Sequence, residues 1–389
     1  MQTPYFLIHE NLLNENVMAF QQALSKCWPN SQLSYSVKTN SLPWLLEHLR
    51  EMNVFAEVVS DEEYQLALLC GYTDNRIVFN GPIKGNEMIK RSLQNGTVVN
   101  MDSENDLRVW EENRSNDAVV GIRVNVSPEV FNVNDIGYAE DGFRFGFSEE
   151  NGALERALHR IGRVDVGLHL HCNSITRAKE VYIAIAKYAT GIIKKYKLIP
   201  AYIDMGGGFF GGVPGKTTPE EYIQAIGKEF ESVVDFEKTK LIIEPGSAII
   251  GSVVDLYTSV LDAKDTNHAR IVTTDGSRIH IDPLWIKHGY MHTIYAKSSE
   301  KHPKQVICGY TCMDHDRLMI IEDEKELSVG DQIVYHKVGA YSMTFGGMFI
   351  RYLPNVYVEK MNSIKQVRGS ITTKRYLDIQ RGVGEYGEC

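Results

Sequence analysis

The stretch "SYSVKTN", residues 34–40, runs through strand-forming residues to Lys38 and then into a Thr-Asn turn. A lysine at the end of a strand is most often solvated, because lysine side chains are rarely buried. LSYSV at 33–37 is the first of eight apolar stretches of strand length. The other seven are VFAEVV (54–59), RIVF (76–79), TVVN (97–100), AVVGIRVNV (118–126), VDVGLHLH (164–171), AYIDMG (201–206) and KLIIEPG (240–246).

Helical patterns separate most of these stretches. Residues 60–71 open with a capping box formed by Ser60 and Glu63 and close on a glycine, while residues 175–197 repeat apolar side chains at intervals of three and four. Eight strand-helix units over about 220 residues match a (β/α)8 TIM barrel, whose parallel strands are covered on both faces. The sequence therefore predicts an α/β fold with a barrel at residues 11–255. Residues 127–147 interrupt the rhythm and are interpreted as a loop near the site.

After residue 255 short strand-like stretches follow one another without helices of barrel length between them: IVTTDGSRIHIDP (271–283), KQVICGY (304–310), LMIIED (318–323) and DQIVYHKVGAY (331–341). We predict a second, β-rich domain, a β-barrel or sandwich made of residues 1–10 and 256–389. TPYFLIHE, residues 3–10, is expected to add an edge strand to it. A helix should follow, because Leu13, Val17, Phe20 and Leu24 fall on one helical face.

The composition of the chain limits the classes of molecule that it is expected to bind. The chain has 389 residues, 43% of them hydrophobic, and a net charge of −9 without a basic cluster, which argues against nucleic acid and favours a small-molecule ligand. No window reaches the roughly 18 to 20 apolar residues that span a bilayer, so no membrane association is expected. The six cysteines lack metal-like spacing and are interpreted as reduced thiols of a cytoplasmic protein.

Functional side chains of a (β/α)8 barrel gather where its strands end, because the loops there build the site. The predicted strand ends carry Lys38, Glu57, Arg123, Asn125, His171, Gly206, Gly207, Gly208 and Glu244. Each of these residues alone is typical of a solvated strand end or of a turn. Together they combine an amine, acids, an imidazole and a glycine cradle for an anion. Pyridoxal phosphate needs this set: a lysine for the Schiff base, an acid for the pyridine nitrogen, and donors for the phosphate.

Ten motifs in order strengthen this interpretation: YSVKTN, AEVVSDEE, NGPIK, RVNV, RFGF, LHLHCNS, DMGGGF, EPG, GYTCMDHD and GAYSM. With them the chain resembles the fold type III pyridoxal-phosphate decarboxylases, the group of ornithine, diaminopimelate and arginine decarboxylases that shares its barrel with alanine racemase. The resemblance covers nearly the whole chain. It implies pyridoxal 5'-phosphate as cofactor and an amino-acid decarboxylase as the activity.

The resemblance also implies roles for single residues. Lys38 would carry the internal aldimine, His171 would stack on the cofactor ring, and Glu244 would pair with the pyridine nitrogen. Cys312, with Asp316 in its loop, would come from the opposite subunit of a homodimer with shared sites and would protonate the carbanion. The residues implied to hold the phosphate or to lie close by are Ser174, Gly206, Gly207, Gly208, Gly246, Tyr341, Glu57 and Arg123.

The chain departs from the resembled family at residues that would contact the substrate. Met313 follows Cys312, at a position where family members that act on basic amino acids have an acid. Asp314, the next residue, is an alternative residue to bind a distal amine of the substrate. Asp282 stands before Pro283 where diaminopimelate decarboxylases place an arginine. We therefore predict an amino-acid unit on a larger or less charged molecule, with Asp282, Met313, Asp314 and Asp316 as candidate substrate contacts.

Phosphate binding is expected to be rearranged or weaker than in the family, since Ser247 replaces a common arginine and Asn173 a usual glycine. Three other functions stay open. The same cofactor and barrel serve racemases, and a catalytically inactive relative would bind a partner. His169 and His171 also share one strand face, as in barrel zinc hydrolases. The further zinc ligands are not evident, so no metal is expected and His169 is interpreted as structural. Cys312 itself has an alternative role as a small buried apolar residue.

Overall fold

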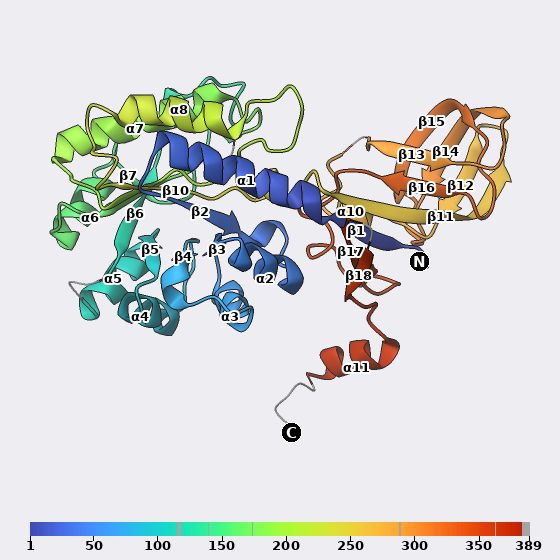
Figure 1. The fold of residues 1–389 in the computed structure, drawn as a ribbon, viewed down its shortest axis with the longest axis horizontal. Coiled ribbons are helices and arrows are strands. Elements are labelled where there is room, and N and C mark those ends of the chain that lie inside the picture. Colours follow the sequence, from blue (N-terminus) through green and yellow to red (C-terminus); the bar gives the residue numbers. More distant parts are fainter. Residues whose placement is uncertain (115–117, 139, 173, 288, 362, 383–389) are drawn as a thin grey trace. The chain divides into compact units, whose positions relative to one another are not determined.

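The structure is a computed structural model that describes residues 1–114, 118–138, 140–172, 174–287, 289–361 and 363–382 (Figure 1). The chain divides into two compact units. One unit is residues 15–249, and the other combines residues 1–14 with 250–389. The sequence-based boundaries lie at residues 11 and 255, a few residues from these divisions.

The first unit contains a closed barrel of eight parallel strands. They are β2 (Ser31–Ser36), β3 (Phe55–Val58), β4 (Ile77–Phe79), β5 (Val98–Met101), β6 (Val120–Asn125), β8 (Gly167–Leu170), β9 (Tyr202–Asp204) and β10 (Lys240–Ile243). The order β5-β4-β3-β2-β10-β9-β8-β6 closes through the pairing of β5 with β6. Each of the eight predicted stretches supplies one strand, which confirms the TIM barrel. A short strand, β7 (Phe147–Ser148), pairs with β6.

Helices follow the barrel strands in the expected alternation (Figure 1). They are α2 (Pro43–Glu51), α3 (Asp61–Leu69), α4 (Asn86–Gln94), α5 (Glu104–Glu112), α6 (Ala153–Ile161), α7 (Lys179–Tyr196), α8 (Pro219–Phe230) and the single turn α9 (Ser247–Ile250). The longer helix α1 (Glu10–Cys27) precedes β2, and its predicted apolar positions Leu13, Val17, Phe20 and Leu24 are all buried. The sequence pattern therefore gave the correct buried face.

The start of α3 differs in one bond from the predicted capping box. The Ser60 hydroxyl accepts from the Glu63 backbone N–H at 3.2 Å, as expected for an N-cap. The Glu63 carboxylate, however, accepts from the backbone N–H of Val59 at 2.9 Å. The carboxylate thus stabilises the turn between β3 and α3, which directly follows Glu57.

Tyr202 fills the interior of the barrel. Its ring is buried together with Val78, Val98 and Ile242. A Cβ atom at Gly121 would lie 2.2 Å from the Tyr202 hydroxyl, and one at Gly167 would lie 2.2 Å from its ring. Glycine is required in β6 and β8 because the tyrosine occupies the space that their side chains would need.

The segment expected to be an irregular loop has little regular structure. After a 3-10 turn, η3 (Pro128–Val130), it runs to β7 without a helix. The carbonyl of Asp135 accepts from the Ile175 backbone N–H at 2.8 Å and from the Ser174 hydroxyl at 3.3 Å. This loop therefore packs on the loop that follows β8.

The second unit is β-rich, as predicted. Its strands are β1 (Tyr5–His9), β11 (Val254–Asp265), β12 (Arg270–Thr274), β13 (His292–Tyr295), β14 (Lys301–Cys308), β15 (Arg317–Lys325), β16 (Gln332–Tyr335), β17 (Asn355–Lys360) and β18 (Ser363–Arg368). Two helices accompany them, α10 (Arg278–Ile281) and α11 (Thr373–Arg381). The order β15-β14-β12-β11-β1-β17-β18 forms the main sheet, and β16 pairs with β11 and β13.

The prediction that β1 lies at a sheet edge is wrong. β1 pairs antiparallel with β11 on one side and parallel with β17 on the other, and residues 5–8 are buried. His9 at its end contacts acids of both neighbours, with Nδ1 2.8 Å from Glu359 and Nε2 3.2 Å from Asp255. The inner position follows because β17, which the sequence patterns did not identify, covers the free edge of β1.

Candidate active site

Lys38 lies directly after β2, in the single 3-10 turn η1 (Val37–Thr39). Its Nζ donates to the Ser36 hydroxyl at 2.7 Å and to Glu57 Oε2 at 3.1 Å. The Ser36 hydroxyl donates to the same carboxylate oxygen at 2.6 Å. The Glu57 side chain is 1% exposed, whereas that of Lys38 is 44% exposed. A buried acid thus holds a lysine whose amine remains accessible.

Asn80 joins this pair to Glu244. Its Nδ2 donates to Glu57 Oε1 at 3.0 Å and to Glu244 Oε1 at 2.7 Å. Asn80 directly follows β4 and Glu244 directly follows β10, so each lies at a carboxyl end of a barrel strand. The two predicted acids are therefore brought together through an asparagine that the sequence analysis did not single out.

The hydrogen bonds continue into the barrel interior. Asn100 Nδ2 donates to Asn80 Oδ1 at 2.8 Å and to Asp204 Oδ2 at 3.1 Å, and its Oδ1 accepts from the Tyr202 hydroxyl at 2.7 Å. We call Glu57, Asn80, Asn100, Asp204 and Glu244 the buried carboxyl ring. Its members are at most 4% exposed. Both amides are oriented by these bonds, because only their Nδ2 atoms can donate to carboxylates.

Two acids of the ring titrate abnormally. Burial raises the pKa of Glu244 well above its usual value, and the negative charges of Asp204 and Glu57 raise it further. Burial also raises the pKa of Asp204 to about 6, against hydrogen bonds that lower it. Neighbouring carboxyl groups in a buried site favour sharing a proton over double ionisation. Burial and the neighbouring acids therefore favour the protonated form of Glu244 in the cofactor-free protein.

His169 lies beside this acid pair. Its Nε2 is 3.9 Å from Glu244 Oε2, and one ligand atom each of His169, Asp204 and Glu244 lie within 4.8 Å of one another. Burial lowers the pKa of His169 well below its usual value, so the ring is neutral. These three are the described residues that could hold a metal ion. The zinc alternative considered His169 but missed both acids, which come from β9 and from the end of β10.

His171 lies just after β8 against the glycine loop. A Cβ atom at Gly206, where φ is 64°, would lie 2.7 Å from the His171 ring, and one at Gly207 would lie 2.3 Å from the Glu244 carbonyl oxygen. Gly208 also has a positive φ of 90°. The loop can approach the imidazole and the end of β10 only without side chains. The backbone N–H of Gly206 donates to Asp204 at 3.0 Å and so faces inward.

Burial and the positive charges of Arg123 and Lys38 lower the pKa of His171 to about 3. Arg123 is itself held between Asp102, 3.3 Å from its Nη1, and the Phe145 ring, whose centre lies 4.4 Å from the guanidinium carbon. His171 is therefore a neutral aromatic surface, and Arg123 is a fixed cation close enough to affect it.

Gly246 completes the contact between the last and the first barrel strand. A Cβ atom there would lie 1.9 Å from Thr39 Oγ1, in the turn that carries Lys38. Thr39 Oγ1, Arg123 Nε and both ring nitrogens of His169 are buried and lack a hydrogen-bond partner within the described part of the chain. Unpaired buried polar atoms are rare in folded proteins, and these four lie near the carboxyl ends of barrel strands, where a bound ligand would give them partners.

Residues 12–251 match the sequence profile of a family described as pyridoxal-dependent decarboxylase, pyridoxal binding domain. The chain belongs to the pyridoxal-dependent decarboxylases. The predicted family, enzyme class and general reaction, decarboxylation of an amino acid, are thereby confirmed. Decarboxylation is favoured over racemisation for the same reason.

Relatives with assigned names are similar over most of this decarboxylase. A diaminopimelate decarboxylase of Archaeoglobus fulgidus is 28% identical over 362 residues, which are 89% of this chain and 85% of the relative. The crystal structure of diaminopimelate decarboxylase from M. jannaschi superposes with a TM-score of 0.86 at 22% identity, covering 99% of this chain and 93% of that one. The Helicobacter pylori diaminopimelate decarboxylase, solved with L-lysine, gives 0.81 at 22%, covering 98% of both chains. The structural similarity supports the fold.

The barrel residues of this decarboxylase fit a pyridoxal cofactor. An accessible amine, a buried acid with a raised pKa, a neutral imidazole and unpaired donors all lie near the carboxyl ends of the strands. Ser174 is less available, because its hydroxyl donates to Asp135 and accepts from the Arg177 backbone N–H at 2.8 Å. Asn173 lies outside the described residues. Ser247 begins α9 and supplies no cation for a phosphate.

The β-rich unit holds Cys312 in a loop anchored by Asp316. Asp316 Oδ2 accepts from the hydroxyls of Ser277 and Thr311 at 2.9 and 2.7 Å, and Oδ1 accepts from the Arg278 backbone N–H at 3.0 Å. Asp316 is 2% exposed, whereas Cys312 is exposed and a free thiol. The alternative in which Cys312 is a buried apolar residue is wrong, because the bonds of Asp316 hold the loop at the surface. The buried Asp316 therefore fixes the conformation of the Cys312 loop through these hydrogen bonds.

Asp282 is likewise committed within its own unit. It forms an ion pair with Arg278 and accepts from the Lys287 backbone N–H at 3.0 Å and from the Tyr290 hydroxyl at 3.1 Å. Burial opposes ionisation of Asp282, but these bonds outweigh it and lower its pKa. Met313 and Asp314 lie in the Cys312 loop. Tyr341 is 38% exposed with a positive φ of 52°.

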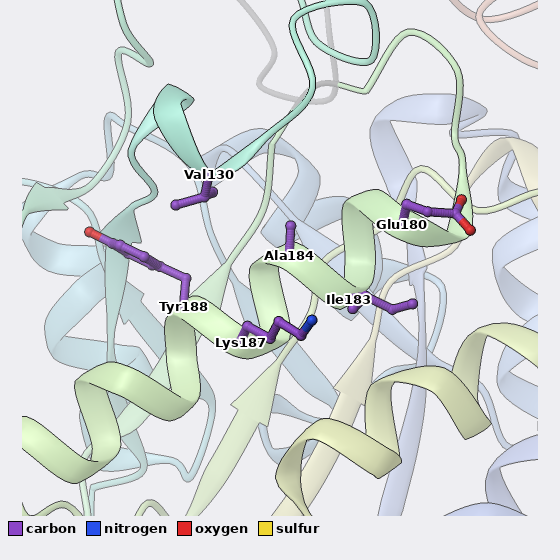
Figure 2. Close-up of a pocket in the computed structure, with 6 residues that line it drawn as sticks. All are labelled: Val130, Glu180, Ile183, Ala184, Lys187 and Tyr188. Atoms are coloured by element: carbon purple, nitrogen blue, oxygen red, sulfur yellow. The ribbon is translucent and has the colours of Figure 1, made fainter.

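The barrel unit also contains a hollow of about 530 Å³ (Figure 2). It is lined by Val130 of η3 and by Glu180, Ile183, Ala184, Lys187 and Tyr188 of α7. None of these residues belongs to the buried carboxyl ring or to the glycine loop.

Proposed function

We propose that this chain is a pyridoxal-phosphate-dependent amino-acid decarboxylase in which Lys38 holds the cofactor covalently. The cofactor, when bound, supplies the electron sink needed for loss of carbon dioxide. The observation that carries the proposal is the bonded connection from Lys38 through Glu57 and Asn80 to Glu244. Through these hydrogen bonds an accessible amine and a buried acid with a raised pKa share one support.

The remaining barrel residues have matching tasks. Glu244, whose raised pKa favours its protonated form, can share a proton with a pyridine nitrogen, and His171, kept neutral, offers its face to an aromatic ring. The loop of Gly206, Gly207 and Gly208 provides a backbone surface without side chains, and the buried hydroxyl of Thr39 beside Gly246 is a donor for phosphate oxygens. Arg123 is proposed to support this anion.

The substrate is proposed to be an amino-acid unit on a larger or less charged molecule. The named relatives are diaminopimelate decarboxylases, whose substrate ends in a second amino-acid group. Here Asp282 is buried and engaged by Arg278, so this position offers no cation to a distal carboxylate. Met313, next to the exposed Cys312, offers an adaptable apolar contact. Asp314 is the alternative residue proposed to bind a distal amine of the substrate.

Carbon dioxide release across a panel of free and conjugated amino acids tests the substrate class. We expect turnover of a conjugated or weakly charged substrate at least about tenfold more efficient than that of diaminopimelate, lysine or ornithine, because an unpaired distal charge would cost about 1–3 kcal/mol. Efficient release from diaminopimelate would contradict the substrate proposal. A change in the chirality of the substrate without release of carbon dioxide would identify a racemase. Absence of both reactions in protein that binds no cofactor would identify an inactive relative.

We also propose a homodimer with shared active sites, in which Cys312 of one subunit serves Lys38 of the other. Exposed apolar side chains are concentrated in two segments of the β-rich unit, and such exposure is typical of surfaces that associate. They are Leu284, Ile286, Met291, Tyr295, Tyr341, Phe345, Phe349 and Ile350. The exposed thiol of Cys312 is proposed to deliver a proton to the substrate carbon after carbon dioxide leaves.

Mixing two inactive variants tests the shared site. Lys38→Ala and Cys312→Ala subunits, unfolded together and refolded, should regain about a quarter of the active sites, because about half of the dimers are mixed and each holds one intact site. Each variant refolded alone is the control. Absence of recovery, with mixed dimers present on a native gel, would place both residues in the same subunit.

A further inference from the structure

Asn80 occupies a special position among the polar residues of the barrel. Its two Nδ2–H groups are divided between two acids, Glu57 at 3.0 Å and Glu244 at 2.7 Å. Its Oδ1 accepts from Asn100 at 2.8 Å, which fixes the direction of the amide. Asn80 is 2% exposed, so water cannot replace these bonds.

We propose that Asn80 is a positioning residue that sets the geometry and the charge of Glu57 and Glu244 together. This inference rests on the proposed function, in which Glu57 holds Lys38 and Glu244 faces the pyridine nitrogen. Through one amide, the acid at the covalent end of the cofactor and the acid at its ring nitrogen are stabilised side by side.

The physical reason for an amide is the number of acids in the ring. Glu57, Asp204 and Glu244 are three carboxyl groups buried in one hydrogen-bonded group, and each needs donors. Asparagine supplies two donors without adding charge. Aspartate has the same shape, but when ionised it has no donor and adds a further negative charge beside Lys38 and Glu244.

Asn80→Asp therefore tests the proposal with little change in volume, and Asn16→Asp is its matched control. Asn16 is a buried asparagine of α1 whose Nδ2 donates at 3.0 Å to the Ile249 carbonyl, outside the ring. Three quantities are compared: the thermal unfolding temperature, the Kd for pyridoxal phosphate added to cofactor-free protein, and the pH midpoint of the absorption of Lys38-bound cofactor.

We expect Asn80→Asp to weaken cofactor binding at least about tenfold, because two buried acids lose a donor. We expect its absorption midpoint to move by about one unit to higher pH, because an added negative charge favours the protonated nitrogen at Lys38. Asn16→Asp should lower the unfolding temperature but leave both cofactor readouts unchanged. Asn80→Ser keeps one donor and adds no charge, so it should weaken cofactor binding less than Asn80→Asp and leave the absorption midpoint unchanged. It replaces Asn80→Asp in the binding test if that variant does not fold.

Cofactor binding within about twofold of wild type and an unmoved midpoint in both Asn80 variants, with unfolding temperatures lowered as in Asn16→Asp, would reduce Asn80 to a structural residue and overturn the inference. If the proposed function itself is wrong, a different result is expected. Wild-type protein would then show no cofactor attached to Lys38 after borohydride reduction, whatever the variants do.

Discussion

Replacing Lys38 with alanine is expected to abolish both carbon dioxide release and the covalent attachment of pyridoxal phosphate. The Lys38 amine is the accessible member of the bonded group around Glu57, whose other described hydrogen-bond partners are the Ser36 hydroxyl and the Asn80 amide. Turnover should fall at least about a thousandfold, as for other residues that form the covalent bond. Carbon dioxide release measures the first loss, and cofactor absorption with peptide mapping after borohydride reduction measures the second.

Lys38→Arg sharpens this test. Arginine keeps a positive charge beside Glu57 but cannot bond covalently to an aldehyde under these conditions. It should therefore preserve the unfolding temperature better than Lys38→Ala while losing turnover equally. Lys90→Ala, an exposed lysine of α4 paired with Glu87, is the surface control. Retained turnover in Lys38→Arg, or cofactor mapped to another lysine, would contradict the assignment of Lys38.

The barrel could be predicted from sequence because each of its strands is a short apolar run that is buried on both faces. The same rule located Lys38, Glu57 and Glu244, since polar residues that follow the barrel strands gather at the carboxyl end of the barrel. Register then explains their meeting: Ser36 of β2 pairs with Glu57 of β3, which places Glu57 beside the turn that carries Lys38.

The interior of the site was harder to predict. Asn80, Asn100 and Asp204 stand inside quoted motifs or strands, yet single buried amides and acids have no distinctive spacing in a sequence. Their signal was a polar residue that closes an otherwise apolar strand, as in IVFN and TVVN. The inner position of β1 was missed for a related reason. It depends on pairing with β17, about 350 residues away in the chain, and local patterns carry no information about such pairings.

Glu244→Gln is expected to lower activity and to raise the stability of the cofactor-free protein. Glutamine keeps an oxygen that can accept from Asn80, and it removes the acid that faces the pyridine nitrogen. Turnover should fall at least about a hundredfold, the usual loss when a charge-stabilising group leaves a buried site. Stability should rise by on the order of 1 to 3 kcal/mol, because one buried ionisable group is gone.

The pH dependence distinguishes this explanation from a general packing effect. Burial raises the pKa of Asp204 from 3.8 to about 6 and that of Glu244 well above 4.5. An acid whose folded pKa is raised keeps its proton while the unfolded chain loses it, so stability falls as the pH rises between the two values. The cofactor-free wild type should therefore lose stability from about pH 4 upward, and Glu244→Gln should lose less above about pH 6. Glu63→Gln is the comparison for stability alone, because burial raises the pKa of Glu63 to about 7 outside the ring. Parallel stability curves for Glu244→Gln and wild type would show that Glu244 is ionised in the cofactor-free protein, and the shared proton would then be excluded.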